Sequence, residues 1–189
     1  TAAWTTVLPV FGAATLIVGT LLAIRQTDLK QMLAYTTVSS LGLMVMMTGM
    51  GLPHAVEGAV LYLIAHALFK GGLFMVAGLI DHETGTRDLT KLGGLAKAMP
   101  ITFAAGLAGA ISMGGLPPFV GFLAKEGIYE ALATGSLFAV VFLLIAIIGN
   151  ALMFAVGFGV GLKPFIGPKT ETPKHAHEGP ALMWLGPIA

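Results

Sequence analysis

Five long apolar runs make up most of this chain and restrict what it can fold into. They cover residues 5–24, 33–50, 56–80, 101–132 and 137–162. A transmembrane helix needs about 20 mainly apolar residues to cross roughly 30 Å of hydrocarbon. With 56% hydrophobic residues, 10% charged residues and a mean hydropathy of +0.89, the composition lies far from that of soluble domains. We predict an all-α membrane protein in which about five transmembrane helices lie in a lipid bilayer.

The fourth run is too long for one straight crossing, and its middle contains residues that break helices. Gly114 and Gly115 add backbone freedom, while Pro117 and Pro118 remove two backbone donors. We therefore predict a discontinuous helix with a break near 114–118. Unwound backbone at membrane depth is stable where it is buried in protein or lines a cavity, and in transporters such breaks often mark the ion site. A simple proline kink is the alternative.

Basic residues gather on one side of this five-helix arrangement. Alternating crossings place the 25–32 turn, the 81–99 loop and the tail after 162 together, and these segments hold eight of the ten basic residues. The opposite turns, 51–55 and 133–136, contain no Lys or Arg. The positive-inside rule then predicts a multi-pass protein of the cell inner (plasma) membrane with cytoplasmic basic loops. The formal net charge of +1 argues against a nucleic-acid partner.

The other two basic residues, Lys70 and Lys125, lie inside apolar runs. A lysine in lipid costs about 3 kcal/mol or more and usually faces an ion or proton route. Tyr62 and His66 precede Lys70 at four-residue intervals, so all three fall near one helix face. We predict a proton relay of Lys70, His66 and Lys125. The alternatives are a hydrogen-bonded core histidine, a Lys70 that snorkels to the basic side, and an ion pair of Lys125 with another helix.

Other polar residues have weaker signals. Tyr62, Thr36 and Ser39 are possible relay support because their hydroxyls can hold waters, although hydroxyls in membrane helices often serve packing. Asn150 is a lone polar residue of the kind that joins helices, and Asp28 lies where a carboxylate suits a helix amino end. The H-x-H pair of the tail, at 175 and 177, lacks a further fixed ligand, so we predict no metal site there. We also predict no cofactor and no catalytic residue.

Three strings carry a resemblance to a known family. They are TDLKQMLAYTTVSSLG at 27–42, HALFK at 66–70 and LPPFVGFLAKE at 116–126. In this order they resemble the proton-translocating antiporter-like subunits shared by respiratory complex I and the Mrp cation/proton antiporters. The segment DHETGTRD at 81–88, which leads into KLGGL at 91–95, and the tail at 167–177 resemble the large A subunit of Mrp antiporters.

The resemblance implies a function and a set of partners. It implies monovalent cation (Na⁺)/proton antiport, with His66 and Lys70 on a central hydrophilic axis and Lys125 on the broken helix. The chain would be the second inverted-repeat half of the antiporter-like bundle, and its partners the first repeat of the parent subunit, other small membrane subunits, protons and Na⁺. Ser40, where the family often has glutamine, and Gly71, where alanine is common, depart from the pattern without removing an ionisable group.

From the two ends of the chain we expect it to be a fragment of a longer protein. Thr1 is not a methionine, and the stretch 181–188 is apolar but too short to span a membrane. We expect a transmembrane half-domain at 1–162 and a polar cytoplasmic tail at 163–189 that leads into a truncated helix.

Two functions other than antiport remain open. One is the proton-pumping membrane arm of complex I (NADH:quinone oxidoreductase) or of a membrane-bound hydrogenase. The other is a structural scaffold, against which the cost of burying two lysines argues.

Overall fold

The computed structural model describes residues 2–180, 183, 186 and 187, and over these residues the protein is helical. The elements are α1 (Ala2–Ile24), α2 (Leu29–Gly49), α3 (Pro53–Thr84), the 3₁₀-helix η1 (Leu95–Lys97), α4 (Pro100–Gly114), α5 (Val120–Leu132) and α6 (Leu137–Gly161). The β structure of the described part is an isolated bridge between Asp28 and Asp88. The all-α prediction is confirmed. The truncated helix predicted at 181–188 lies largely outside the described residues.

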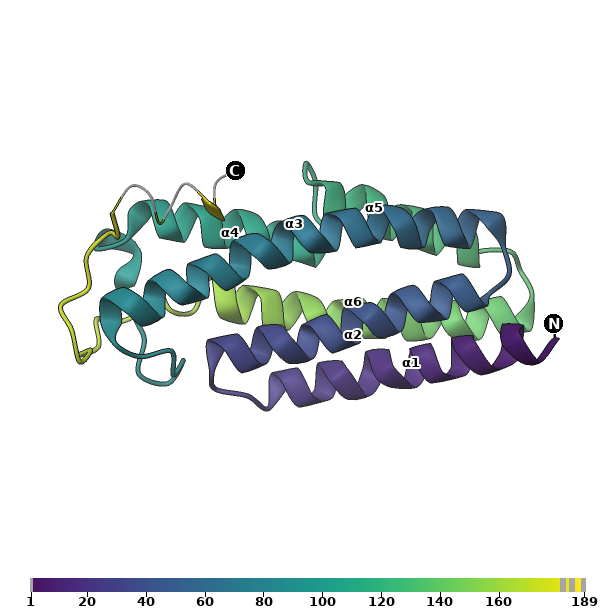
Figure 1. The fold of residues 1–189 in the computed structure, drawn as a ribbon, viewed down its shortest axis with the longest axis horizontal. Helices are drawn as coiled ribbons and strands as arrows, with labels where there is room; N and C mark the ends of the chain where they lie inside the picture. The colour runs from purple at the N-terminus through teal and green to yellow at the C-terminus, as the bar shows by residue number, and fades with distance from the viewer. Residues whose placement is uncertain (1, 181–182, 184–185, 188–189) are drawn as a thin grey trace.

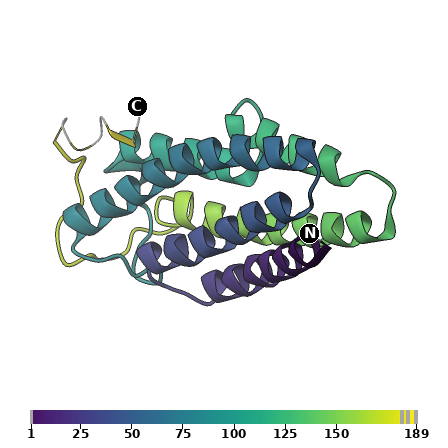
Figure 2. The same ribbon diagram turned by 45° about the vertical axis from the view of Figure 1, so that its right-hand side comes forward.

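The helices run side by side along the long axis in two layers (Figure 1). One layer contains α1, α2 and α6, and the other contains α3 with α4 and α5; Figure 2 shows the same separation from another angle. α2 packs against both α1 and α3, while α6 packs against α4 and α1. By length and composition α1, α2, α3 and α6 can each cross a membrane, and α4 is a shorter apolar helix.

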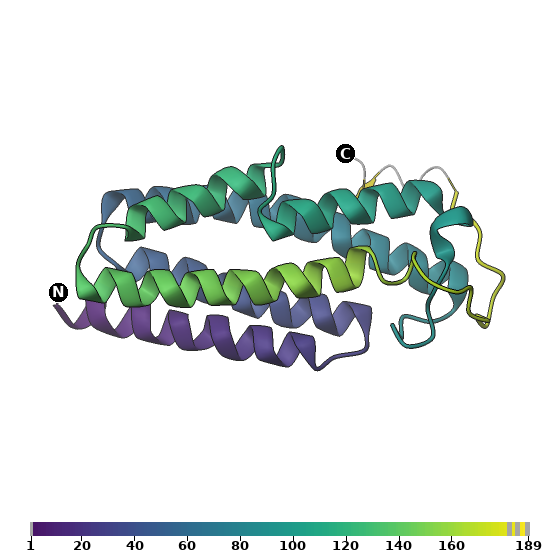
Figure 3. The same ribbon diagram turned by 180° about the vertical axis from the view of Figure 1, so that it is seen from behind.

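The predicted fourth crossing is two helices that lie end to end (Figure 3). α4 ends at Gly114, and Gly115 follows in the left-handed conformation with φ +76°, which glycine adopts at little cost. The chain then passes through the cis Pro117–Pro118 peptide before α5 begins at Val120. The discontinuous helix is therefore confirmed, and the simple kink is wrong.

Helix α3 extends beyond both ends of the apolar run from which it was predicted, and by about one turn at its carboxyl end. It continues through Asp81 to Thr84 and ends at Gly85, whose φ of +74° is left-handed. The apolar run stops at the first charged residue, whereas backbone hydrogen bonding continues to the residue that leaves the helical conformation. Asp81, His82 and Glu83 therefore belong to the helix and not to the loop.

The chain after α6 turns back over the end of the bundle that holds the α3–α4 connection, which we call the basic end (Figure 2). The backbone N–H of Ala96 donates to the carbonyl of Phe165 at 3.1 Å. The Phe165 ring is buried and lies 5.0 Å from the ring of Phe103, centre to centre. Further along, the N–H of Lys174 donates to the carbonyl of Thr84 at 3.1 Å. The tail is therefore packed on α3, η1 and α4.

Candidate functional site

Lys70 lies inside the bundle and points from α3 to α2. Its side chain is 4% exposed, and Nζ donates to the Leu33 carbonyl at 2.9 Å and to the Thr36 hydroxyl. Both acceptors are neutral oxygens. Among the described residues, no carboxylate oxygen lies within 4.0 Å of this ammonium. The side chain is turned into the protein and does not extend along the surface to the basic end.

Tyr62 and His66 occupy the same buried face of α3 as Lys70. The Tyr62 hydroxyl shares a hydrogen bond of 3.2 Å with Ser40 of α2. Its ring centre lies 6.3 Å from that of His66. The Nε2 atom of His66 is buried without a hydrogen-bond partner among the described residues. The face therefore carries a phenol, an imidazole with one open position and an ammonium, at intervals of roughly 6 Å along the helix.

Lys125 occupies an equally buried position at the helix break. It is 4% exposed, and its Nζ donates to the Met113 carbonyl at 2.8 Å. Met113 lies in the last turn of α4, where carbonyls lack helical partners. The residue four positions later, which would supply the helical N–H, is Pro117, and proline has none. The proline thus leaves open the carbonyl that Lys125 binds.

Gly115 opens the path by which Lys125 reaches this carbonyl. A Cβ atom at position 115 would lie 2.5 Å from Cδ of Lys125. Nearby carbonyls of α4 have other partners, because the N–H of Gly115 donates to Ser112 at 3.0 Å and that of Leu116 donates to Ile111 at 3.1 Å. Lys125 therefore adds a side-chain donor to a helix end that the backbone caps only in part.

The acidic residues that follow Lys125 do not pair with it. Glu126 and Glu130 are both exposed. No described carboxylate lies within 4.0 Å of Lys125. Asn150 of α6 donates through Nδ2 to the hydroxyl of Tyr129 on α5 at 2.9 Å, so it joins two helices as predicted. The described structure contains no ion pair that would account for Lys125.

Thr36 and Ser39, the two residues of α2 that were predicted to support the relay, face different helices in the structure. Thr36 contacts Lys70, whereas Ser39 faces α1, where its hydroxyl donates to the Leu16 carbonyl at 2.8 Å. Ser39 is also hydrogen-bonded to Thr20. Ser40 holds Tyr62 instead, a role that sequence reasoning missed. The missed signal is its position one turn after Thr36.

Backbone carbonyls were also missed as partners of the two lysines. The carbonyls of Leu33 and Met113 both accept from a lysine ammonium. The available signal was Pro117, which follows Met113 by the four residues of a helical hydrogen bond.

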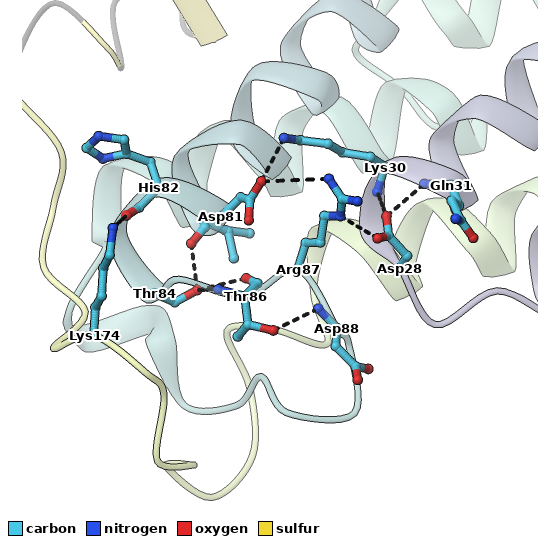
Figure 4. Close-up of polar contacts among 11 residues, drawn as sticks. Asp28, Lys30, Gln31, Asp81, His82, Thr84, Thr86, Arg87, Asp88 and Lys174 are labelled. Atoms are coloured by element: carbon cyan, nitrogen blue, oxygen red, sulfur yellow. Dashed lines mark hydrogen bonds and ion pairs between the residues drawn. The ribbon is translucent and has the colours of Figure 1, made fainter.

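The basic end carries a cluster of charged groups that ties the α3–α4 loop to the start of α2 (Figure 4). Asp28 lies at the amino end of α2, as predicted, and caps the helix by accepting from the N–H groups of Lys30 at 2.9 Å and Gln31 at 3.0 Å. It also pairs with Arg87. Lys30 in turn pairs with Asp81 at 2.8 Å. Lys30 and Asp81 also help to line a hollow of about 510 Å³.

The loop residue Asp88 has a perturbed pKa. Hydrogen bonds from the Thr90 hydroxyl at 2.7 Å and the Thr90 N–H at 3.0 Å stabilise its charged form and lower the pKa of Asp88 from 3.8. Lys91 lowers it further. The carboxylate is therefore fully charged at neutral pH.

In the part of the chain that the structure describes, no group of three or more His, Cys, Asp or Glu side chains is arranged to hold a metal ion. His177 of the H-x-H pair instead contacts the carboxylate of Glu83 at 3.0 Å.

Comparisons with known proteins agree on one family. Residues 1–149 match the family described as NADH:quinone oxidoreductase/Mrp antiporter, TM. The chain is 41% identical over 212 residues to the A subunit of the Na(+)/H(+) antiporter of Alkalihalophilus pseudofirmus, and 40% identical over 208 residues to that of Bacillus subtilis. Each alignment covers 99% of this chain and 26% of the relative. The chain thus spans about a quarter of the length of these relatives.

Two solved structures share the fold. The membrane-bound sulfane sulfur reductase, an archaeal respiratory membrane complex, aligns with a TM-score of 0.89 and 29% identity over 97% of this chain and 30% of the other. The Mrp complex from Dietzia sp. DQ12-45-1b aligns with a TM-score of 0.83 and 29% identity over 92% of this chain and 32% of the other.

Proposed function

This chain belongs to the NADH:quinone oxidoreductase/Mrp antiporter transmembrane family, and we propose that it forms a proton route within a monovalent cation/proton antiporter. In this proposal it is one half-channel of the A subunit of a Na⁺/H⁺ antiporter. The remaining part of the parent subunit supplies the other repeat, and small membrane subunits complete the complex. The basic end faces the cytoplasm, in keeping with the positive-inside rule.

The proposal is carried by the two buried lysines, whose ammonium groups donate to neutral oxygens among the described residues. Lys70 donates to a carbonyl and a hydroxyl, and Lys125 donates to a carbonyl. A lysine paired with a buried carboxylate would leave an unpaired anion behind when it lost its proton, at a cost of several kcal/mol. Bound to neutral oxygens, each lysine can lose and regain a proton without leaving such a charge. This arrangement suits a relay better than a scaffold.

His66 is the intermediate group of the proposed route. It lies one helical turn from Lys70, and its Nε2 atom has an open hydrogen-bond position. Imidazole can accept a proton at one nitrogen and release one from the other. Protons would pass among Lys70, His66, waters and Lys125, while the cation moves elsewhere in the complex.

The test is proton movement in membrane vesicles that contain the complete parent complex. A dye reports the pH gradient, and sodium chloride is added to trigger antiport. We expect sodium to collapse the gradient in wild type but not in Lys125→Ala, nor in Lys125→Arg, whose guanidinium keeps the charge and the donor but does not release its proton. The proposal is wrong if Lys125→Ala transports like wild type.

A second candidate function is the proton-pumping membrane arm of a redox complex. The observation that favours it is the TM-score of 0.89 against an archaeal respiratory membrane complex. The same vesicles separate the two functions. If sodium has no effect while NADH or another reductant builds a gradient, the redox-pump function replaces antiport.

A further inference from the structure

Helix α4 lacks a capping side chain of its own at its amino end. The N-cap residue is Met99, whose side chain makes no capping hydrogen bond, and the next residue, Pro100, carries no N–H. The N–H of Phe103 donates to the Met99 carbonyl at 2.9 Å, which is the first internal bond of the helix. The N–H groups of Ile101 and Thr102 therefore need acceptors from outside the helix.

The carboxylate of Glu178 in the tail accepts from both N–H groups. Its Oε2 accepts from the N–H of Ile101 at 2.8 Å and from the N–H of Thr102 at 3.4 Å. Its Oε1 accepts from the hydroxyl of Thr102, a residue that is fully buried. Glu178 lies 76 residues beyond Thr102 in the sequence. A carboxylate at this position also interacts favourably with the positive end of the helix dipole.

The tail segment that carries Glu178 is itself bonded to α3. The Nζ of Lys174 donates to the His82 carbonyl at 3.1 Å, as Figure 4 shows. His177 contacts Glu83, a buried carboxylate that also contacts His82 at 2.9 Å. Glu178 therefore reaches α4 from an anchored position.

The two ends of α4 thus hold charges of opposite sign. Glu178 binds the first N–H groups, and Lys125 binds the carbonyl of Met113 in the last turn. Because α4 has only 15 residues, a movement at its amino end also moves Met113. The distance between Met113 and Lys125 therefore depends on whether Glu178 holds the other end.

We propose that Glu178 is a positioning residue of the proton route. Its carboxylate fixes α4 so that the Met113 carbonyl stays within hydrogen-bond reach of the Lys125 ammonium. This inference rests on the proposed function of Lys125 as a proton carrier. The capping contact itself can be tested without any transport.

The first experiment measures amide hydrogen exchange in the purified parent complex. Glu178→Ala and Glu178→Gln are compared with Glu171→Gln, which removes a tail carboxylate that is exposed and contacts no described partner. Loss of a capping carboxylate corresponds to about fivefold faster exchange at Ile101 and Thr102. We expect this in Glu178→Ala, a smaller increase in Glu178→Gln and none in Glu171→Gln. Equal exchange in all three variants would overturn the proposal.

The second experiment measures the pH profile of transport per assembled complex in the vesicles described above. We expect Glu178→Ala to shift the profile or to reduce transport at least about twofold, while Glu171→Gln follows wild type. If Glu178→Ala lowers only the amount of complex and leaves the pH profile unchanged, Glu178 is merely structural and the proposal is wrong.

Failure of the proposed function gives a different result. If wild-type vesicles show no response to sodium, antiport is wrong, and the profile of the reductant-driven gradient then decides the role of Glu178 by the same criterion. Thr102→Val, which removes one partner of the carboxylate and keeps the backbone N–H groups, adds a double-mutant test. Its effect on exchange should be smaller when Glu178 is already alanine.

Discussion

Lys70 and Lys125 are buried to the same extent, at 4% exposure, but the acceptors that hold them differ. The Leu33 carbonyl that accepts from Lys70 lies inside α2 and also accepts from the Thr37 hydroxyl at 2.9 Å. The Met113 carbonyl that accepts from Lys125 lies at the end of α4, where Pro117 supplies no N–H. Lys70 binds an acceptor with other donors, whereas Lys125 binds one that the helix leaves open.

Because of this difference, removing the ammonium group should have different effects on stability at the two sites. Removing the ammonium of Lys70 leaves its acceptors bonded within α2. Removing that of Lys125 leaves a buried carbonyl unsatisfied, which costs about 1–3 kcal/mol. Lys125 therefore contributes to the structure of the break as well as to the proposed proton route, and Lys70 contributes mainly to the route.

The largest effect is expected from Gly115→Ala, which disturbs only the Lys125 site. The left-handed backbone at φ +76° costs an alanine about 1–2 kcal/mol. The new Cβ also pushes the Lys125 stem away, so that the hydrogen bond to Met113, worth about 2 kcal/mol, is lost. We expect a destabilisation of about 3 kcal/mol from these two contributions, measured as a lower midpoint of thermal unfolding of the purified parent complex, together with loss of sodium-triggered transport.

Gly135→Ala is the matched control for this substitution. Gly135 has φ +79°, and a Cβ there would meet nothing within 4 Å. It therefore reproduces the backbone strain, about 1–2 kcal/mol, without the collision. If Gly135→Ala impairs transport as much as Gly115→Ala, strain alone explains the loss and the path of Lys125 over Gly115 has no special role.

The next largest effect is the difference in stability between the variants Lys125→Met and Lys70→Met. Both substitutions remove a buried ammonium and insert a chain of similar length, so the cost of burying charge largely cancels in the comparison. What remains is the open carbonyl at Met113. We expect Lys125→Met to be less stable than Lys70→Met by about 1–3 kcal/mol, while both abolish proton transport.

Thermal unfolding of the two purified variants checks this difference. Equal stability would mean that water or a shifted backbone group satisfies Met113 as well as lysine does. In that case the distinction between the two sites fails.

Local features of the sequence were sufficient to predict much of the fold. The apolar runs predicted α1, α2, α3 and α6 because crossing a bilayer requires length and hydrophobicity, which can both be read directly. The break was predictable because Gly115 and Pro117 act on their own backbone. The placement of Asp28 at the amino end of α2 was predictable from the residues next to it.

Contacts that depend on helix rotation or on distant segments were not predictable. Ser39 and Ser40 are adjacent, yet one faces α1 and the other holds Tyr62, since successive residues of a helix are turned by about 100°. The sequence does not reveal which of the two serines faces α3. Glu178 reaches α4 across 76 residues without any periodic pattern. Such a contact becomes visible only when the tail is placed in space.

Asp28→Ala is expected to disturb the site around Lys70 and to leave the site around Lys125 unchanged. Asp28 caps α2, the helix that supplies the acceptors of Lys70. Loss of the cap costs about 1 kcal/mol, and the partly exposed pair with Arg87 adds little. Hydrogen exchange should become faster at Lys30 and Gln31 and stay unchanged at the α4–α5 break.

Asp28→Asn is the control, because asparagine caps a helix as well as aspartate does but cannot pair with Arg87. It should exchange like wild type at Lys30 and Gln31. Faster exchange at the break in either variant would show that the two lysine sites are coupled through α2.

The smallest effect is expected from Thr90→Val, in the loop next to α2. The Thr90 hydroxyl lowers the pKa of Asp88, so the stabilisation that Asp88 gives the loop is fully present above its ordinary pKa of 3.8 and is lost as the pH falls through the lowered value. Without the hydroxyl the pKa rises toward 3.8, and acid loosens the loop at a higher pH. Hydrogen exchange of residues 85–91 between about pH 2 and 5 measures this shift. At neutral pH the carboxylate is charged in both proteins, so both lysine sites and transport should match wild type; a change in transport there would mean that this exposed loop controls the Lys70 site.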